Sequence, residues 1–141
     1  GYLTTRTVPT GTPVSFAPNG FGESTKLAIG TANYVSNIAY HPNGAVNTAT
    51  YGNGRNYTQT LTARQQPFDI KVQGTGGTLI NLRHGYDARG KIASIYDYVT
   101  SGQNRSFGYD GRGRLTTASG AWGSGTFKYD GLDNIRHGQH A

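Results

Sequence analysis

FGYDGRGRL at residues 107–115 and FKYDGLDNI at residues 127–135 carry almost the same phrase, and this repetition determines the predicted fold. In each stretch an aromatic residue stands two positions before a tyrosine, an aspartate follows the tyrosine, and an aliphatic residue stands six positions after it. Residues two apart in an extended strand point to the same face of a sheet. The aspartate can accept backbone N–H groups of a following turn, and glycine adopts positive φ there without steric cost. Each phrase therefore predicts a β-hairpin with its turn at Tyr-Asp-x-x-Gly.

The same spacing recurs along the chain, which is the signature of a repeat protein. Each of four motif tyrosines is followed six positions later by an aliphatic residue: Tyr40 by Val46, Tyr86 by Ile92, Tyr109 by Leu115 and Tyr129 by Ile135. Looser copies are anchored at Pro18 and Leu61, so that successive anchors lie 20 to 25 residues apart. We therefore expect residues 1–141 to form a single array of about six repeats, degenerate over 1–80 and well formed over 81–141. Because Gly1-Tyr2-Leu3 matches the end of a motif, we expect a fragment of a longer array.

The composition agrees with an all-β fold of repetitive antiparallel hairpins. The chain of 141 residues contains 22 Gly and ten Tyr, is 34% hydrophobic, and has no stretch that combines helical periodicity, a cap and freedom from Gly or Pro. It contains no cysteine, which excludes disulfides and cysteine-type zinc sites. No apolar run approaches the length of a membrane span, and the first residues lack a signal-peptide pattern. If the protein is exported, we expect the export signal to lie outside this chain.

Three stretches carry a family resemblance: YDARGKI at 86–92, YDGRGRL at 109–115 and YDGLDNI at 129–135 resemble the YD repeats of the RHS (rearrangement hot spot) proteins. YHPNGAV followed by TYGNG is similar to the looser repeats of such proteins, so the resemblance covers essentially the whole chain. It implies a sheet that forms part of a spiralling β-sheet shell, as in the C component of insecticidal Tc toxins and in the animal teneurins. In bacterial polymorphic toxins that shell encloses a variable C-terminal toxin.

The resemblance thus implies a structural segment that encapsulates and helps deliver a toxin or effector. The implied partners are flanking RHS repeats and the enclosed toxin domain, and the implied location is secreted or on the bacterial cell surface. The family's self-cleaving segment has an Asp-Pro-x-Gly signature that this sequence does not contain, and His41-Pro42-Asn43-Gly44 is similar to it only superficially. We therefore expect shell wall without an autoproteolytic role.

No residue stands out as catalytic, cofactor-binding or metal-ligating, so we expect neither an enzyme nor a cofactor. The motif aspartates Asp87, Asp110 and Asp130 stand alone in separate turns, whereas calcium needs several converging oxygens, so we expect turn residues. The histidines lack metal-ligand spacing apart from an i, i+3 pair near the end of the chain; they are His41, His84, His137 and His140. GSG at 123–125 is expected to be a Gly-rich loop without a nucleophile elbow, and Asp130 with Asp133 to be part of a turn.

The net charge of +6 is the remaining signal, because it attracts polyanions. Cations alternate with aromatic residues near the end of the chain; the cations are Arg105, Arg112, Arg114, Lys128 and Arg136, and the aromatics Phe107, Tyr109, Phe127 and Tyr129. A nucleic-acid platform needs both kinds on one exposed face, and we expect strand alternation to separate them, so nucleic acid is not an expected partner. The alternative function is a lectin-like, carbohydrate-binding cell-surface module using exposed Tyr, Arg and Trp122. The shell hypothesis also predicts that the isolated fragment self-associates through open sheet edges.

Overall fold

A computed structural model describes residues 1–140, with side chains up to Arg136, and it contains thirteen β-strands and no helix in that range. The chain divides into two compact units, Gly1–Ile80 and Asn81–Ala141. All pairs of neighbouring strands within each unit are antiparallel and follow chain order. The predicted all-β fold of antiparallel hairpins is therefore confirmed.

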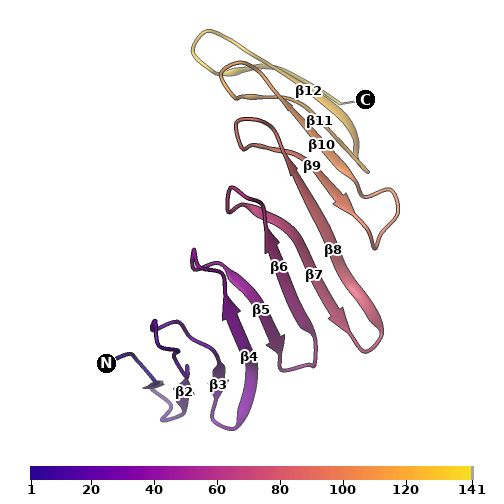
Figure 1. The fold of residues 1–141 in the computed structure, drawn as a ribbon. Coiled ribbons are helices and arrows are strands. Elements are labelled where there is room, and N and C mark those ends of the chain that lie inside the picture. Colours follow the sequence, from indigo (N-terminus) through magenta and orange to yellow (C-terminus); the bar gives the residue numbers. More distant parts are fainter. Residues whose placement is uncertain (141) are drawn as a thin grey trace. The chain divides into compact units, whose positions relative to one another are not determined.

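The first unit contains seven strands and the start of an eighth (Figure 1): β1 (Thr5–Thr7), β2 (Pro13–Ser15), β3 (Leu27–Ile29), β4 (Ala32–Tyr40), β5 (Val46–Tyr51), β6 (Asn56–Leu61), β7 (Pro67–Gly74) and β8 (Gly77–Tyr86). The second unit contains the end of β8 and five further strands: β9 (Ile92–Asp97), β10 (Arg105–Tyr109), β11 (Leu115–Gly120), β12 (Gly123–Tyr129) and β13 (Ile135–His140). The phrases anchored at Tyr40, Leu61, Tyr86, Tyr109 and Tyr129 each occupy the end of one even-numbered strand, the turn after it and the start of the next strand. The phrase anchored at Pro18 lies between β2 and β3, where Pro18 pairs with Ser24 in an isolated bridge.

One prediction about a loop was wrong. Residues 123–125, expected to be a Gly-rich loop, begin strand β12, where Ser124 pairs with Ser119 and Gly125 pairs with Ala118. Gly125 is buried. Small residues here allow close approach of neighbouring strands, so the glycines serve the sheet rather than interrupt it.

A β-bulge lies immediately before the anchor residue in five hairpins. The repeat spacing alone did not predict this bulge. In the β10–β11 hairpin, Gly108 pairs with Thr117 but Tyr109 pairs with Leu115, so that Thr116 is the extra residue. The register shifts at the equivalent point in the β4–β5, β6–β7, β8–β9 and β12–β13 hairpins. Because bulges bend a strand and increase its right-handed twist, each hairpin turns at the same place relative to its tyrosine.

Over residues 1–140, neither unit has a second layer that covers its sheet. Among the described residues only Ala28 and Ala49 are buried apolar side chains, and no large side chain is fully buried. The strands are therefore held mainly by contacts to the neighbouring strands of their own sheet. In residues 1–140 no helix has the length and apolar character needed to cross a membrane.

Candidate functional site

The turn that follows Tyr109 is closed by backbone hydrogen bonds and by the Asp110 carboxylate. The Asp110 N–H donates to the Arg114 carbonyl (3.0 Å), and the Gly113 N–H donates to the Asp110 carbonyl (2.9 Å). The Asp110 carboxylate accepts the backbone N–H groups of Arg112 and Arg114, both at 2.9 Å. Gly113 has a φ of 82°, in the left-handed region that glycine adopts freely. This is the three-residue hairpin loop in which a type I turn ends in a left-handed residue.

The other two motif aspartates of the second unit bond their turns in the same way. Asp87 accepts the N–H groups of Arg89 (2.9 Å) and Lys91 (2.8 Å), and Asp130 accepts those of Leu132 and Asn134, both at 2.9 Å. Each carboxylate therefore serves its own turn, which confirms the expected turn role. Among the described side chains, no three His, Asp or Glu residues lie together as a metal site would require.

In the first unit the same turn follows each of the three motif anchors, and none of these three turns contains an aspartate at the first position. The backbone N–H of Asn19, His41 and Thr62 donates to the carbonyl four residues later, and each carbonyl accepts the N–H three residues later. The residue four positions after each anchor has positive φ: Gly22 at 84°, Gly44 at 82° and Gln65 at 63°.

Side-chain oxygens other than a carboxylate stabilise these turns. The Asn19 side chain accepts the N–H groups of Phe21 (2.9 Å) and Glu23 (3.0 Å), and the Thr62 hydroxyl oxygen accepts those of Arg64 and Gln66, both at 3.2 Å. Asparagine and threonine make the same local bonds as aspartate, but threonine makes them more weakly. Sequence reasoning did not single out Asn19 or Thr62, although this shared chemistry was the signal that could have found them.

Three motif tyrosines join their hairpin to the motif before it. The Tyr109 hydroxyl donates to the Ile92 carbonyl (2.9 Å), and the Tyr129 hydroxyl donates to the Leu115 carbonyl (2.8 Å). In both cases the acceptor stands six positions after the preceding motif tyrosine. Tyr40 makes the equivalent bond to the Ser24 carbonyl (2.7 Å), and Ser24 stands six positions after the anchor Pro18. Each of these hydroxyls thus donates to a backbone carbonyl of the preceding motif, and we call this contact the tyrosine latch.

Cations reinforce the tyrosine latch in the second unit, contrary to expectation. The Lys91 ammonium lies 5.3 Å from the centre of the Tyr109 ring, and the Arg114 guanidinium lies 4.6 Å from the centre of the Tyr129 ring. Strand alternation was expected to place the arginines opposite the aromatic residues. That prediction was wrong for Arg114, because this residue belongs to the turn, where the backbone no longer alternates. Each pair is within cation–π range.

Arg114 is the most connected side chain of this joint. Its guanidinium donates to Asp110 of its own turn (2.7 Å) and to Asp133 of the next turn (2.5 Å). The backbone N–H of Arg114, followed by its guanidinium, lowers the pKa of the Asp110 carboxyl below its ordinary value. The backbone N–H of Asn134 lowers the pKa of the Asp130 carboxyl in the same way. Both carboxyls are therefore held in their charged form.

Side chains three positions after the anchor also reach the next turn. Arg89 donates to the carbonyls of Asp110 (3.1 Å) and Gly111 (2.6 Å), and Arg112 lies 3.5 Å from Asp133. Asn43 donates to the Gln65 carbonyl (3.4 Å) in the first unit. Successive turns are thus linked side by side along one edge of each unit's sheet.

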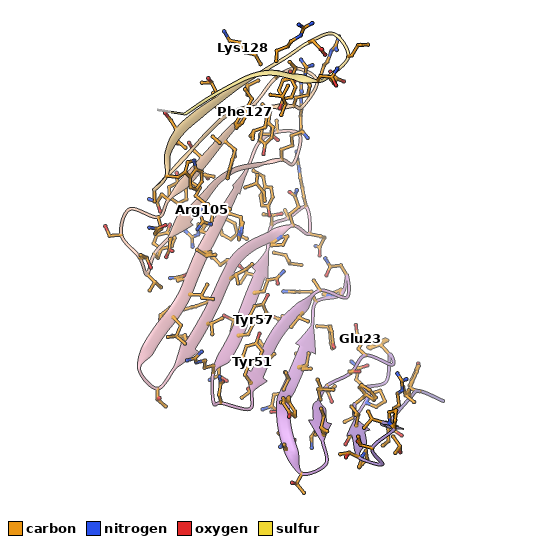
Figure 2. The ribbon with its side chains drawn as sticks, turned by 180° about the vertical axis from the view of Figure 1, so that it is seen from behind. Glu23, Tyr51, Tyr57, Arg105, Phe127 and Lys128 are labelled. Carbon is orange, nitrogen blue, oxygen red and sulfur yellow. The ribbon has the colours of Figure 1, made fainter. Side chains whose placement is uncertain are left out.

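The two faces of each sheet differ in chemistry. In the second unit, Ser94, Ser106, Ser119 and Ser124 are directly paired across four strands and form one hydroxyl row. Phe107, Ala118 and Gly125 form the paired row on the opposite face. Phe127 and Lys128, consecutive in β12, show the same division by pointing to opposite sides of the strand (Figure 2).

The first unit has the same two-sided character when it is considered alone. Thr48, Thr58 and Lys71 pair across three strands on one face, and Ala49, Tyr57 and Val72 pair on the other. Tyrosine anchors therefore belong to an apolar, half-buried face, and the opposite face carries hydroxyl and amide groups.

The remaining candidate residues have structural surroundings or lie outside the described side chains. Asp133 occupies the glycine position of its turn with a φ of 66° and binds Arg114, and the His41 ring lies 2.8 Å from the Gln59 carbonyl. Trp122 is 53% exposed, and its ring lies against Gly120. Arg105 lies on the apolar face, paired with Ile95, because it stands two positions before Phe107 in β10, so the expected separation of cations from aromatic residues was wrong for Arg105 as well. The side chains of His137 and His140 lie outside the described residues.

Comparison with known proteins gives a family model and a fold. Residues 86–124 match the model described as RHS Repeat. No curated protein matched the chain.

Solved structures match the whole chain. A Tc holotoxin pore of Photorhabdus luminescens superposes with a TM-score of 0.86 at 20% identity, covering 100% of this chain and 8% of that chain. A TcdB2-TccC3-TEV structure gives a TM-score of 0.88 at 19% identity, covering 100% of this chain and 9% of that one. A TcdB2-TccC3-Cdc42 structure gives a TM-score of 0.87 at 19% identity, covering 99% of this chain and 8% of that chain.

This chain therefore spans less than a tenth of the length of those chains. The family match spans the turns at Asp87 and Asp110 and the Tyr109 latch. Residues 86–124 are thus similar to an RHS repeat, and the chain has the β-sheet fold of these Tc toxin structures.

Proposed function

We propose that this chain is a wall segment of a β-sheet shell that encloses a C-terminal toxin or effector domain and takes part in its delivery. In this proposal residues 1–141 are an array of about six RHS-type repeats within a longer protein that is secreted or lies on the bacterial cell surface. The enclosed domain and the flanking repeats are its partners.

The tyrosine latch is the observation that carries the proposal. Tyr40, Tyr109 and Tyr129 each hold one hairpin to the hairpin before it through a backbone carbonyl. Such contacts extend a single sheet by any number of hairpins without a second layer, and a one-layer sheet suits a wall. Side by side stacking of identical units also explains why the phrase repeats.

The bonds made by the polar motif groups support a structural role for them. Asp87, Asp110 and Asp130 are bonded to their own turns, and the Arg114 guanidinium is bonded to two carboxylates. These groups fix structure, so in this proposal any activity belongs to the enclosed domain.

Limited proteolysis of the complete protein tests the proposal. We expect the C-terminal domain to resist protease in the wild type and to be cleaved much faster in the Tyr109→Ala and Tyr129→Ala variants, because those changes open the wall. Tyr34→Ala is the matched control, since Tyr34 is a 53% exposed tyrosine on β4 outside the motif positions. A C-terminal domain that is cleaved equally fast in wild-type protein and variants would contradict the shell proposal.

A carbohydrate-binding module is the second candidate, and one observation favours it. Arg83 lies 5.5 Å from the centre of the Tyr98 ring, Tyr98 is 57% exposed, and Trp122 is also exposed. Exposed aromatic rings beside a cation suit sugar rings and acidic groups. Saturable glycan binding that is lost in Tyr98→Ala or Trp122→Ala, with unchanged stability, would support this function. The absence of binding across a glycan array would count against it.

A further inference from the structure

A pocket of about 440 Å³ in the first unit is lined by residues of two successive motif turns: Phe21, Glu23, Tyr40, His41 and Pro42. Glu23 lies in the loop between β2 and β3 (Figure 2), and Tyr40 ends β4. Phe21 is 87% exposed, whereas Glu23 and Tyr40 are half-buried. One carboxylate therefore shares this pocket with two aromatic rings.

The second unit builds a pocket from the same motif positions, and there the chain supplies its own cations. Arg89, three positions after its anchor, donates to the carbonyls of Asp110 (3.1 Å) and Gly111 (2.6 Å). Lys91, five positions after the same anchor, lies 5.3 Å from the centre of the Tyr109 ring. A guanidinium and an ammonium thus hold the two turns together.

The first unit has different side chains at these two positions. Phe21 stands three positions after the anchor Pro18, where the second unit has Arg89. Glu23 stands five positions after Pro18, where the second unit has Lys91. The pocket therefore carries a negative charge and an aromatic ring in place of two cations.

The Tyr40 ring is held as the cation-binding rings of the second unit are held. Its hydroxyl donates to the Ser24 carbonyl (2.7 Å), which is the same latch that Tyr109 makes. The cation–π pairs among the described side chains involve other tyrosines. The Glu23 carboxylate accepts the Asn19 amide (2.8 Å) and makes no ion pair with a described cation, so its charge is not neutralised there.

Arg114 shows within this chain which group satisfies a ring and a carboxylate together. Its guanidinium lies 4.6 Å from the centre of the Tyr129 ring and donates to Asp110 at 2.7 Å. A guanidinium is planar, so it can lie over a ring while its edge donates to a carboxylate.

We propose that the pocket binds a guanidinium group carried on an alkyl chain. The guanidinium lies against the Tyr40 ring and donates to the Glu23 carboxylate, and the alkyl chain contacts Phe21. The carbonyls of His41 and Pro42 stand at the two motif positions that accept a guanidinium in the second unit. The negative charge of Glu23 disfavours phosphates and other anions. This site does not depend on the shell function.

Ligand-observed saturation-transfer NMR on the complete protein tests the proposal. The probes are n-butylguanidinium and N-acetylarginine amide, and their neutral isosteres n-butylurea and N-acetylcitrulline amide are the controls. We expect saturable binding of a guanidinium probe and at least about tenfold weaker binding of its urea isostere, as for hydrogen bonds to charged groups. Tighter binding of n-butylguanidinium makes a free alkylguanidine the ligand, and tighter binding of N-acetylarginine amide makes it an arginine side chain.

Variants of the protein locate the site. Glu23→Gln retains an oxygen that can accept the Asn19 amide but removes the charge, so it should weaken binding about tenfold. Phe21→Ala should weaken binding about 2- to 5-fold, as for one contact between an exposed ring and a cation. Tyr34→Ala is the control, because Tyr34 is a 53% exposed tyrosine of the same unit outside the pocket, and it should leave binding unchanged.

A charge reversal completes the test. Glu23→Arg places a guanidinium at the motif position of Arg114, so it should abolish binding at this pocket by supplying the group from the chain itself. Three results would overturn the proposal: no saturable binding, equal binding of a guanidinium probe and its urea isostere, or equal binding to wild type, Glu23→Gln and Glu23→Arg. None of these results would alter the proteolysis outcome, so failure of this site and failure of the shell proposal are distinguishable.

Discussion

The tyrosine latch predicts a graded loss of stability when Tyr129 is changed in two steps. Tyr129→Phe removes the hydrogen bond to the Leu115 carbonyl (2.8 Å) and should cost about 1 kcal/mol, the net contribution of one such bond. Tyr129→Ala also removes a half-buried ring and, with it, the cation–π contact of that ring with the Arg114 guanidinium, which lies 4.6 Å from the ring centre. We expect a loss of about 3 kcal/mol, the lower end for truncating an aromatic side chain.

Hydrogen exchange measured by mass spectrometry is the suitable assay, because repeat proteins open locally and a single unfolding midpoint does not describe them. Protection should fall for amides in β11 and β12, on the two sides of the joint, and much less for those of the first unit. Tyr34→Phe, at an exposed tyrosine, should leave exchange unchanged.

A double-mutant cycle isolates the contact between Tyr129 and Arg114. Pairing Tyr129→Ala with Arg114→Gln should give a coupling energy of about 0.5–1 kcal/mol for the ring and the guanidinium. The reasoning fails if Tyr129→Phe exchanges like the wild type and Tyr129→Ala costs no more than Tyr129→Phe. In that case the hairpins are held together by backbone pairing alone.

Three further predictions concern the turns. Gly113→Ala should destabilise the second unit by about 1–3 kcal/mol in chemical denaturation, because Gly113 has a φ of 82° and a Cβ there would approach Lys91. Gly111→Ala is the control and should be nearly neutral, because the space around Gly111 is open. Gln65→Gly should stabilise the first unit by up to about 1 kcal/mol, since Gln65 has a φ of 63°, and any destabilisation would contradict the assigned strain. Asp110 has a folded-state pKa below its unfolded value, so its carboxylate stabilises the fold at neutral pH and this contribution is lost as the pH falls below about 4. Asp110→Asn should therefore lower Tm at pH 7 and make its acid decline shallower, and an equally steep decline would refute the assignment.

The hairpin plan could be predicted from sequence because its chemistry is local. The turns at Asp87 and Asp110 are specified by two local features. An aspartate accepts the N–H groups of the residues two and four positions later, and a glycine between them has a positive φ. The ring of Tyr109 and its same-face relation to Phe107 follow from strand alternation. These features need no knowledge of which strand lies beside which.

Features that depend on the neighbouring hairpin could not be predicted in the same way. The bulge at Gly108 and Tyr109 is visible only as a register shift against β11. The placement of Arg114 over Tyr129 requires both the turn geometry and the position of the next hairpin, and alternation alone gave the wrong face. The strand at residues 123–125 was missed because glycine usually weakens strands, whereas here Gly125 is buried between its neighbours.

A cryo-EM structure of the complete protein would show whether this chain forms part of a wall around another domain. We expect further hairpins joined through tyrosine hydroxyls on both sides of these residues, winding into a closed shell with a C-terminal domain inside. An open sheet, or a C-terminal domain lying wholly outside it, would refute the shell proposal.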